Sequence, residues 1–422
     1  MSRSKKKRDN PHDPPPAKAT RGFLAGRILT VVLIVCVAGT AYIFLRNPDP
    51  PAARPPLPVN EASRAPVDIT GWTGRAVAVS NRFHKVYTPC WEGAYGAIGD
   101  VYLFALTGDS SLFRFHMLEH DLRKMCDGTW VDDVAWVCLA ELKWWELTGK
   151  NDRNLVLDAI RRYREVRDQG RLSTHEGFWT WYNWPPGASV GERIFTNSNM
   201  NQMAAVACGL FQATGERQYL QDALLVWNGD GNLPGIEKRW YKGNGVWRGK
   251  EGQAAFGKEL PWGGLGCASL AAALFNATGE QKYRTIAVAT VRRLLDPSTG
   301  WVDSTCFYQI RMDGSGAFVN FLFDAYAVAP AELAEVPQKV ERMLDHVWTN
   351  HEGRAAVMLH DLNDHGIRNG WNPRGGEDGY GVGEVGTVHA QGEAARAFGV
   401  FAYYHSLNAK NTAPGMNRNA TR

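Results

Sequence analysis

The chain lacks the patterns that usually mark a metal site. Its seven cysteines are scattered singly over 422 residues with no CxxC or CxxH spacing, so we expect no zinc site. Cys138, Cys208 and Cys267 lie in apolar helical patterns and are predicted to be buried thiols, while any disulfide pairing stays open. Six histidines and aspartates could also suggest a metal site: His351, His360, His365, His389, Asp361 and Asp364. Their spacing matches no compact ligand set, so we interpret them as polar loop residues. We predict neither a metal nor a cofactor.

Net positive charge is lacking outside the N-terminal tail. The formal net charge is +4, and eight basic residues precede the first apolar run: Arg3, Lys5, Lys6, Lys7, Arg8, Lys18, Arg21 and Arg27. The remaining chain is therefore close to neutral or slightly acidic. Because a nucleic-acid partner requires a basic face on the folded domain, we expect none.

Strand signals are also sparse, whereas helical periodicity is frequent. From about Arg75 onward, apolar residues recur at three- and four-residue spacing, as in Leu155 to Asp168 and Leu265 to Ala277. The pattern predicts an all-α domain.

A short turn sequence recurs after four helical runs. The copies are Leu106 to Asp109 (LTGD), Leu147 to Lys150 (LTGK), Ala213 to Glu216 (ATGE) and Ala277 to Glu280 (ATGE). A glycine after the last turn adopts the left-handed conformation that ends a helix, and the next polar residue can start another. Each copy therefore predicts a tight turn between antiparallel helices.

The helix pairs are predicted to close into a toroid because their spacing is too irregular for an open solenoid. Long loops rich in Gly, Trp and Asn would wall a cleft over its mouth. These loops are Arg171 to Thr196, Trp227 to Trp262 and His360 to Thr387.

The N-terminal residues predict an anchor and a stalk. Residues 1–27 form a basic tail, residues 28–45 form an uncharged apolar run, and residues 46–67 are Pro-rich. At about 1.5 Å per residue the run can span a bilayer as one transmembrane helix. The basic tail places the N-terminus in the cytoplasm and the domain in the periplasm or outside the cell. A cleaved signal peptide is the alternative, although its apolar region is usually only about 7–15 residues long.

The folded domain is expected over residues 75–405, followed by a disordered tail over residues 406–422. We expect it to be a monomer. It is rich in aromatic residues, since the whole chain has 16 Trp, 14 Tyr and 17 Phe. Aromatic planes can stack on the apolar faces of sugar rings, and the alternative is that these residues fill the core.

Two adjacent carboxylates, Asp132 and Asp133, stand between Trp130 and Trp136 at the start of a helix predicted from Ala135 to Leu147. The helix dipole favours one ionised carboxylate, and desolvation can keep the other protonated. Glycoside hydrolysis uses such a division of labour between two carboxyl groups. The alternative is that one aspartate is only a helix N-cap.

The stretch from Trp130 to Gly149 (WVDDVAWVCLAELKWWELTG) resembles the signature of glycoside hydrolase family 76, the α-1,6-mannanase family. Further elements follow in the family's order: GFWTWY from Gly177, TNSNMN from Thr196, PWGGLG from Pro261 and VGTVHAQGEA from Val385. The resemblance covers roughly Arg75 to Tyr404. The PWGGLG element lacks the family's Asn and Gln, so the sugar and the linkage can differ.

The resemblance implies an (α/α)6 barrel and a retaining, endo-acting hydrolase of α-1,6-linked mannose in an extracytoplasmic polysaccharide. Asp132 would be the nucleophile and Asp133 the general acid/base. Substrate-binding residues would be Asn197, Asn201, Trp130, Trp179, Trp181, Tyr182 and Trp262.

Three alternatives remain. A transglycosidase would remodel an envelope glycan or exopolysaccharide on the same barrel. A sugar epimerase would be expected to use histidines and to be cytosolic, which the anchor disfavours. A glycan-binding barrel without turnover is disfavoured by the intact aspartate pair.

Overall fold

The computed structural model describes residues 71–125, 131–167, 197–229, 234–248, 261–299, 315–349 and 388–412. All of them belong to one compact unit, Arg64–Arg422. Its named elements are helices, and the β-structure of the described part consists of isolated bridges such as Gly229 with Pro234. The all-α prediction is therefore confirmed.

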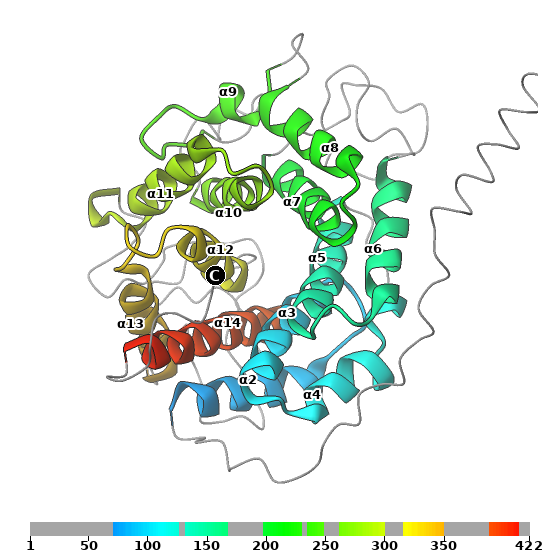
Figure 1. Cartoon of the computed structure of the whole chain (residues 1–422). Helices are drawn as coiled ribbons and strands as arrows, with labels where there is room; N and C mark the ends of the chain where they lie inside the picture. The colour runs from blue at the N-terminus through cyan, green and yellow to red at the C-terminus, as the bar shows by residue number, and fades with distance from the viewer. Residues whose placement is uncertain are drawn as a thin grey trace, which may run out of the picture. The chain divides into compact units, whose positions relative to one another are not determined.

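Six of the described helices form an inner ring in which each contacts the next (Figure 1). In order they are α3 (Trp91–Thr107), α5 (Val131–Leu147), α7 (Asn197–Thr214), α10 (Pro261–Thr278), α12 (Ser315–Val328) and α14 (Val388–Thr412). Helix α14 then packs back against α3 and closes the ring.

A second set of helices covers the ring from outside. They are α2 (Trp72–Val86), α4 (Ser110–Arg114), α6 (Arg153–Val166), α8 (Arg217–Asn228), α11 (Gln281–Leu295) and α13 (Val336–Thr349). Short turns complete the described part: η1 (Phe115–Glu119), η2 (Leu122–Lys124), α9 (Ile236–Trp240) and η6 (Pro297–Thr299). The predicted barrel of helix pairs is confirmed for these helices.

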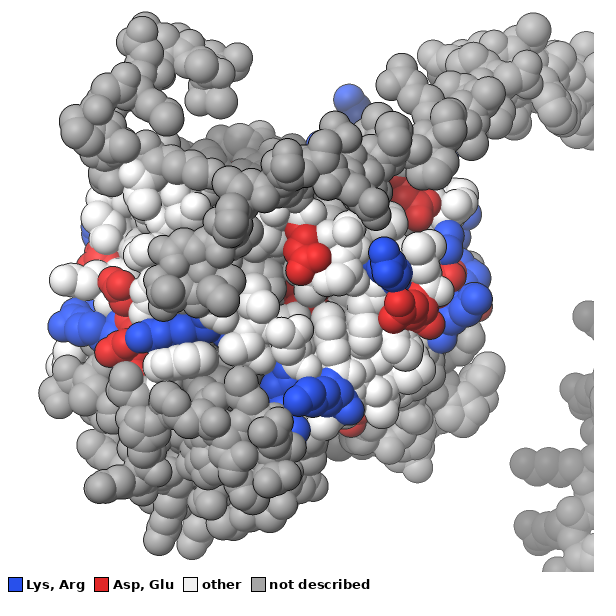
Figure 2. Space-filling model, turned by 90° about the horizontal axis from the view of Figure 1, so that it is seen from below, with Lys and Arg blue, Asp and Glu red and all other residues white. Residues whose placement is uncertain are grey.

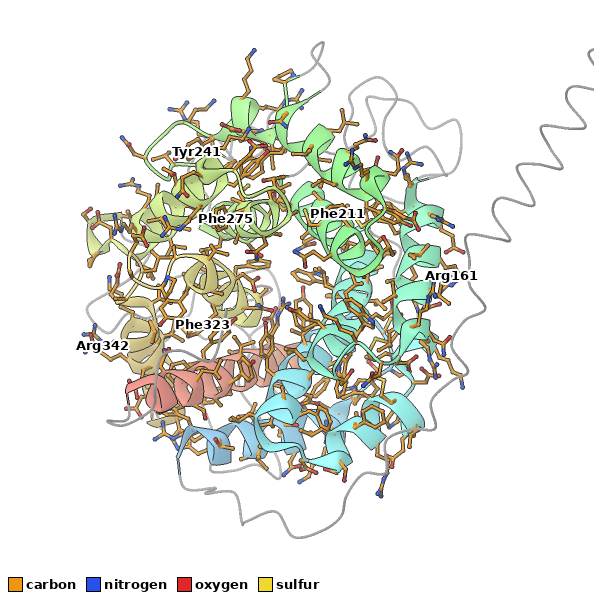
Figure 3. The ribbon with its side chains drawn as sticks, in the orientation of Figure 1. Arg161, Phe211, Tyr241, Phe275, Phe323 and Arg342 are labelled. Atoms are coloured by element: carbon orange, nitrogen blue, oxygen red, sulfur yellow. The ribbon has the colours of Figure 1, made fainter. Side chains whose placement is uncertain are left out.

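The two rings differ in how their side chains are distributed. Arg161 on α6 and Arg342 on α13 point away from the barrel, whereas Phe323 on α12 lies inside it (Figure 3). Inner helices such as α12 are apolar nearly all round because they are covered on several sides, which is the pattern of a buried helix. On the face seen in Figure 2, basic and acidic side chains are interleaved and form no field of one sign.

The four predicted Thr-Gly turns are present, and each ends an inner helix. Their glycines adopt left-handed φ values between 65° and 85°: Gly108, Gly149, Gly215 and Gly279. In each copy the threonine hydroxyl donates to the carbonyl four residues earlier, as Thr214 Oγ1 does to Leu210 O at 2.8 Å. In three copies the same hydroxyl accepts the N–H of the residue after the glycine. The threonine thus helps to fix the turn, a role that the repeat did not reveal.

The ring closes where glycines let the backbones of α3 and α14 touch. A Cβ at Gly399 would overlap the carbonyl of Gly99, and a Cβ at Gly99 would overlap the backbone of Ala395. Gly392 lies two turns before Gly399 on the same face of α14, and a Cβ there would lie 2.9 Å from the carbonyl oxygen of Glu92. Side chains at these positions would push the two helices apart.

A buried carboxylate, Asp100 of α3, connects α2, α3 and η1. Its Oδ1 accepts the Ser80 hydroxyl at 2.6 Å, and its Oδ2 lies 2.6 Å from His84 Nε2 and 2.7 Å from His116 Nε2. Burial alone would raise the pKa of Asp100, but the two histidines more than offset this and hold it well below its usual range. Burial lowers the pKa of His116, which favours the neutral imidazole.

Several expectations concern other parts of the chain. The basic tail, the apolar run over 28–45, the Pro-rich linker, and the loops over 171–196 and 360–387 lie outside the described residues. Among the described helices, none is long and apolar enough to cross a membrane. Helix α14 continues to Thr412, beyond residue 406 where we expected a disordered tail to begin.

We expect Gly399→Ala to lower the free energy of unfolding by roughly 1–3 kcal/mol, because the added methyl meets the backbone of a packed helix. Denaturant unfolding would measure this loss. Gly209→Ala is the matched control, since its Cβ would meet the side-chain end of Leu142, at Cδ1, at 2.9 Å and not a helix backbone. An equal or larger loss in the control would contradict the role of the α3–α14 contact.

The protein should also lose stability as the pH falls from 7 to 5. The folded-state pKa of His116 is lowered, so the unfolded chain takes up the proton first, and stability declines below about pH 6.5. This residue would contribute a slope of up to about 1.4 kcal/mol per pH unit. The lowered pKa of Asp100 acts in the same direction but only below about pH 4.

Denaturant unfolding of His116→Asn at both pH values should give a flatter dependence. His405→Asn changes a half-exposed histidine of α14 and should keep the parent's slope. If His116→Asn also keeps that slope, the buried imidazole is not the source of the pH dependence.

Candidate active site

The two aspartates lie in the first turn of α5. The helix begins at Val131 and not at Ala135 as expected, so the pair belongs to the helix itself. Asp133 is 7% exposed and Asp132 is half-buried. The helix dipole favours a carboxylate at this position, and burial disfavours its charged form. The two adjacent groups therefore experience different environments.

Trp136 lies one turn below the pair and faces the barrel axis. It follows Asp132 by four residues and Asp133 by three, so all three share one side of α5. Its ring centroid is 4.8 Å from that of Tyr95 on α3 and 6.1 Å from that of Phe321 on α12. These aromatic rings form a floor beneath the aspartates.

Arg396 of α14 completes this floor. Its guanidinium carbon lies 4.8 Å from the centroid of the Trp136 ring, a cation–π contact. Nε and Nη2 donate to Asn320 Oδ1 at 3.0 Å and 2.8 Å, and the residue is 2% exposed. Burial lowers the pKa of Arg396. Sequence reasoning missed this residue because it stands just beyond the VGTVHAQGEA element in an unremarkable helical run.

Glu393, one turn before Arg396, holds the start of α12. Its Oε2 accepts the backbone N–H of Gly316 and, at 3.1 Å, that of Ala317. A carboxylate at a helix N-terminus is favoured by the dipole and by the free N–H groups there. A Cβ at Gly316 would overlap the Glu393 backbone, so the glycine allows this approach. Glu393 belongs to the quoted VGTVHAQGEA element, but its role was not foreseen.

Asn201 lies deeper in the barrel than the aspartates. It is 1% exposed, and its Oδ1 accepts the Cys267 thiol of α10 at 3.3 Å. A Cβ at Gly266 would lie 3.0 Å from Asn201 Nδ2, so the last glycine of PWGGLG leaves room for this amide. Its role as a sugar partner stays a prediction.

The backbone positions of Asn197 and Trp262 lie at the first turns of α7 and α10. The side chains of both residues lie outside the described part of the chain, as do Trp130, Trp179, Trp181 and Tyr182 entirely. The inner helices run in the same direction along the barrel. Their first turns, and with them the aspartates, therefore lie at the same end of the barrel. Their contacts with substrate stay predictions.

Three residues of the described part have the spacing of metal ligands: His84, Asp100 and His116. However, both histidine nitrogens lie within 2.7 Å of one carboxylate oxygen, which is a hydrogen-bonding distance. Ligands around a tetrahedral zinc at about 2.0–2.2 Å would stand farther apart than this. We assign the cluster to hydrogen bonding. The other histidines and aspartates considered as ligands lie outside the described part, apart from the backbone of His389 in α14.

The cysteine predictions are confirmed where the structure describes them. Cys138, Cys208 and Cys267 are free and buried. Burial raises the pKa of the Cys208 thiol to about 12, so it stays protonated and inert at neutral pH. Cys90, at the N-cap of α3, is disulfide-bonded.

Comparison with known proteins supports the fold. No family model matches the sequence, and no curated protein is significantly similar to it. An inactive variant of the α-1,6-mannanase GH76A of Salegentibacter sp. HEL1_6, with two consecutive aspartates replaced by asparagine, is in complex with α-1,6-mannotriose. Its structure matches at a TM-score of 0.62 and 15% identity, covering 79% of this chain and 99% of that one.

Two further structures are similar. The family 76 glycoside hydrolase (mannosidase) Bt3792 of Bacteroides thetaiotaomicron has a TM-score of 0.58 at 15% identity, covering 80% of this chain and 99% of that one. Dfg5 of Chaetomium thermophilum, in complex with glucosamine, has a TM-score of 0.59 at 12% identity, covering 83% of this chain and 93% of that one. These identities show the fold alone. The resemblance to family 76 is thus confirmed in the barrel architecture.

Proposed function

We propose that this protein is a glycoside hydrolase of the family 76 type that acts on mannan. One observation carries the proposal: two adjacent aspartates stand in the first turn of an inner helix of this barrel. A mannanase with the same fold is inactive when two consecutive aspartates are changed. The alternative N-cap role would need only one of the two carboxylates.

The proposed mechanism retains the configuration of the anomeric carbon. Asp133 gives its proton to the glycosidic oxygen while Asp132 attacks the anomeric carbon, which breaks the glycosidic bond and forms a glycosyl–enzyme ester. Water then attacks the same carbon, Asp133 takes its proton, and Asp132 leaves as a carboxylate. The greater burial of Asp133 suits the group that starts protonated, because burial disfavours a charged carboxylate.

The proposed substrate is an internal α-1,6-mannosidic linkage, or a related one, in a polysaccharide outside the cytoplasm. A disulfide at Cys90 supports an oxidising compartment, where such bonds persist. The apolar run over residues 28–45 would anchor the domain to the membrane from that side. An anchored enzyme suits the processing of the cell's own glycan.

A transglycosidase is the second candidate. The observation that favours it is a similar structure with bound glucosamine, a sugar that is not a mannan unit. In that reaction the glycosyl–enzyme ester would be attacked by a sugar hydroxyl in place of water. The same aspartates would act, and only the acceptor would differ.

We expect Asp132→Asn and Asp133→Asn each to lower the cleavage of α-1,6-mannan by roughly 10²- to 10⁴-fold, because each removes an acid, base or nucleophile. New reducing ends would be counted with the purified full chain. Asp109→Asn is the matched control, since Asp109 caps α4 and should be dispensable for cleavage.

Other outcomes separate the candidates. Longer chains formed with an added acceptor, without new reducing ends, would favour the transglycosidase. Cleavage that survives Asp132→Asn would refute the assigned nucleophile. A folded protein that binds mannan but neither cuts nor transfers it would favour the glycan-binding barrel without turnover.

A further inference from the structure

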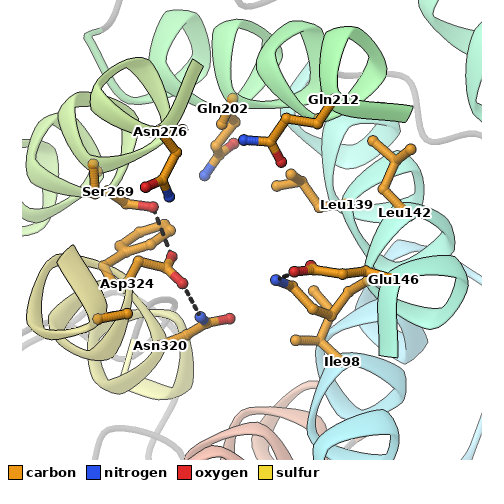
Figure 4. A pocket seen from close by; sticks show the side chains of 18 of the residues that line it. Ile98, Leu139, Leu142, Glu146, Gln202, Gln212, Ser269, Asn276, Asn320 and Asp324 are labelled. Atoms are coloured by element: carbon orange, nitrogen blue, oxygen red, sulfur yellow. Dashed lines mark hydrogen bonds and ion pairs between the residues drawn. The ribbon is translucent and has the colours of Figure 1, made fainter. Parts of the chain in front are cut away.

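A cavity whose lining does not include the aspartates opens inside the inner ring. It has a volume of about 260 Å³ and is lined by inner helices, from Leu139 to Glu146 on α5, from Asn201 to Gln212 on α7 and from Gly266 to Asn276 on α10 (Figure 4). On α5 the lining runs from Leu139, six residues or about 9 Å of helix beyond Asp133, to Glu146, about 20 Å beyond it. Arg396 and Phe321 line the cavity and also contact Trp136, so the aromatic floor separates it from the aspartates.

The charges in this cavity are largely compensated. Lys143 Nζ pairs with Glu146 Oε2 at 2.6 Å. Asp324 accepts the Ser269 hydroxyl at 2.7 Å and the Asn320 amide at 3.1 Å. Arg396 binds the oxygen of the same Asn320 amide, so a chain of polar contacts links the guanidinium to the carboxylate. Lys150, which also lines the cavity, is exposed and lies over the Trp145 ring. A cavity whose buried charges are already engaged favours a neutral ligand over an anion or a cation.

Gln202 of α7 is the observation that points to a ligand. It is 2% exposed, lines the cavity and is directed toward its interior in Figure 4. Neither its Oε1 nor its Nε2 has a hydrogen-bond partner. Leaving such a buried group unsatisfied is unfavourable. An amide offers one acceptor and two donors, which complements hydroxyl groups that both donate and accept.

Other lining residues extend this chemistry along the cavity. Gln212 and Asn276 stand nearer the ends of α7 and α10, and ten residues, or roughly 15 Å of helix, separate Gln212 from Gln202. Phe321 and Tyr404 supply aromatic surface beside these amides. The cavity is smaller than typical drug-sized pockets of about 300–1,000 Å³, which suits a single sugar ring.

We propose that this axial cavity binds a neutral hexose, with Gln202 hydrogen-bonding its hydroxyls at the inner end. The site lies across the aromatic floor from the aspartates, although Asn201, a predicted substrate residue, also lines it, and it does not depend on the proposed hydrolysis. The host for the test is the full chain carrying Asp132→Asn and Asp133→Asn, so that turnover cannot contribute heat.

Isothermal titration calorimetry would measure D-mannose and D-glucose binding to this host and to the host carrying Gln202→Leu. We expect the leucine to weaken hexose binding by roughly tenfold or more. We also expect it to leave the Tm unchanged or raised, because it replaces an unpartnered buried amide by an apolar group of similar size. Gln281→Leu is the same change at an exposed position of α11, and it should alter neither the hexose affinity nor the Tm.

Several results would overturn the proposal. Hexose binding that is equal in the host and in Gln202→Leu would place the sugar elsewhere, such as at the aspartate mouth. A marked fall in Tm for Gln202→Leu would show that the amide bonds to the protein. Saturable binding of inorganic phosphate or Ca²⁺ without hexose binding would assign the cavity to ions. Mannitol that binds as tightly as the hexoses would refute recognition of a sugar ring. Mannitol is an open chain and lacks the flat face that would stack on Phe321.

Discussion

The contact between α3 and α14 is the constraint on which the barrel depends. These helices stand at opposite ends of the folded sequence, and the inner ring closes only where their backbones touch at Gly99 and Gly399. Such a contact excludes side chains and water from the seam, so dispersion between two backbones replaces interdigitated side chains. The same closure places Arg396 beneath Trp136 and lets Glu393 reach the start of α12. Both the floor under the aspartates and the axial cavity follow from it.

The Thr-Gly turns give the barrel two chemically different ends. Because these turns stop successive inner helices at one end, the first turns of the helices gather at the other. First turns present free N–H groups and the positive end of the dipole, which suit carboxylates such as Asp132 and Glu393. Later turns present carbonyls and the negative end, and here the described cavity is lined by amides and by the Lys143–Glu146 pair. The repeated turn thus gives the barrel one end with acidic side chains and another end with mainly neutral polar side chains.

The sequence allowed the local features to be predicted better than the contacts across the ring. The turn glycines, the helical periodicity and the buried thiols are each encoded within a few neighbouring residues, and the structure describes them as expected. Arg396 and Gln202 could not be found in this way. Their partners, or lack of partners, are set by helices far away in sequence, and neither residue type is unusual within a helix. The start of α5 was misplaced by one turn because two aspartates suggested a cap where the helix had already begun.

The buried polar residues along the axis argue that function, more than stability, shaped the centre of this barrel. Replacing a buried charge by a well-packed apolar group is often neutral or stabilising, so Arg396 is not needed to hold six apolar helices together. The network of Arg396, Asn320 and Asp324 instead keeps the axis polar as far as Ser269, beside the aromatic floor. An apolar axis would have filled with side chains, as small barrels do. The polar network therefore keeps open a cavity with hydrogen-bonding groups, and a sugar ring is the kind of molecule that can satisfy those groups and the aromatic faces together.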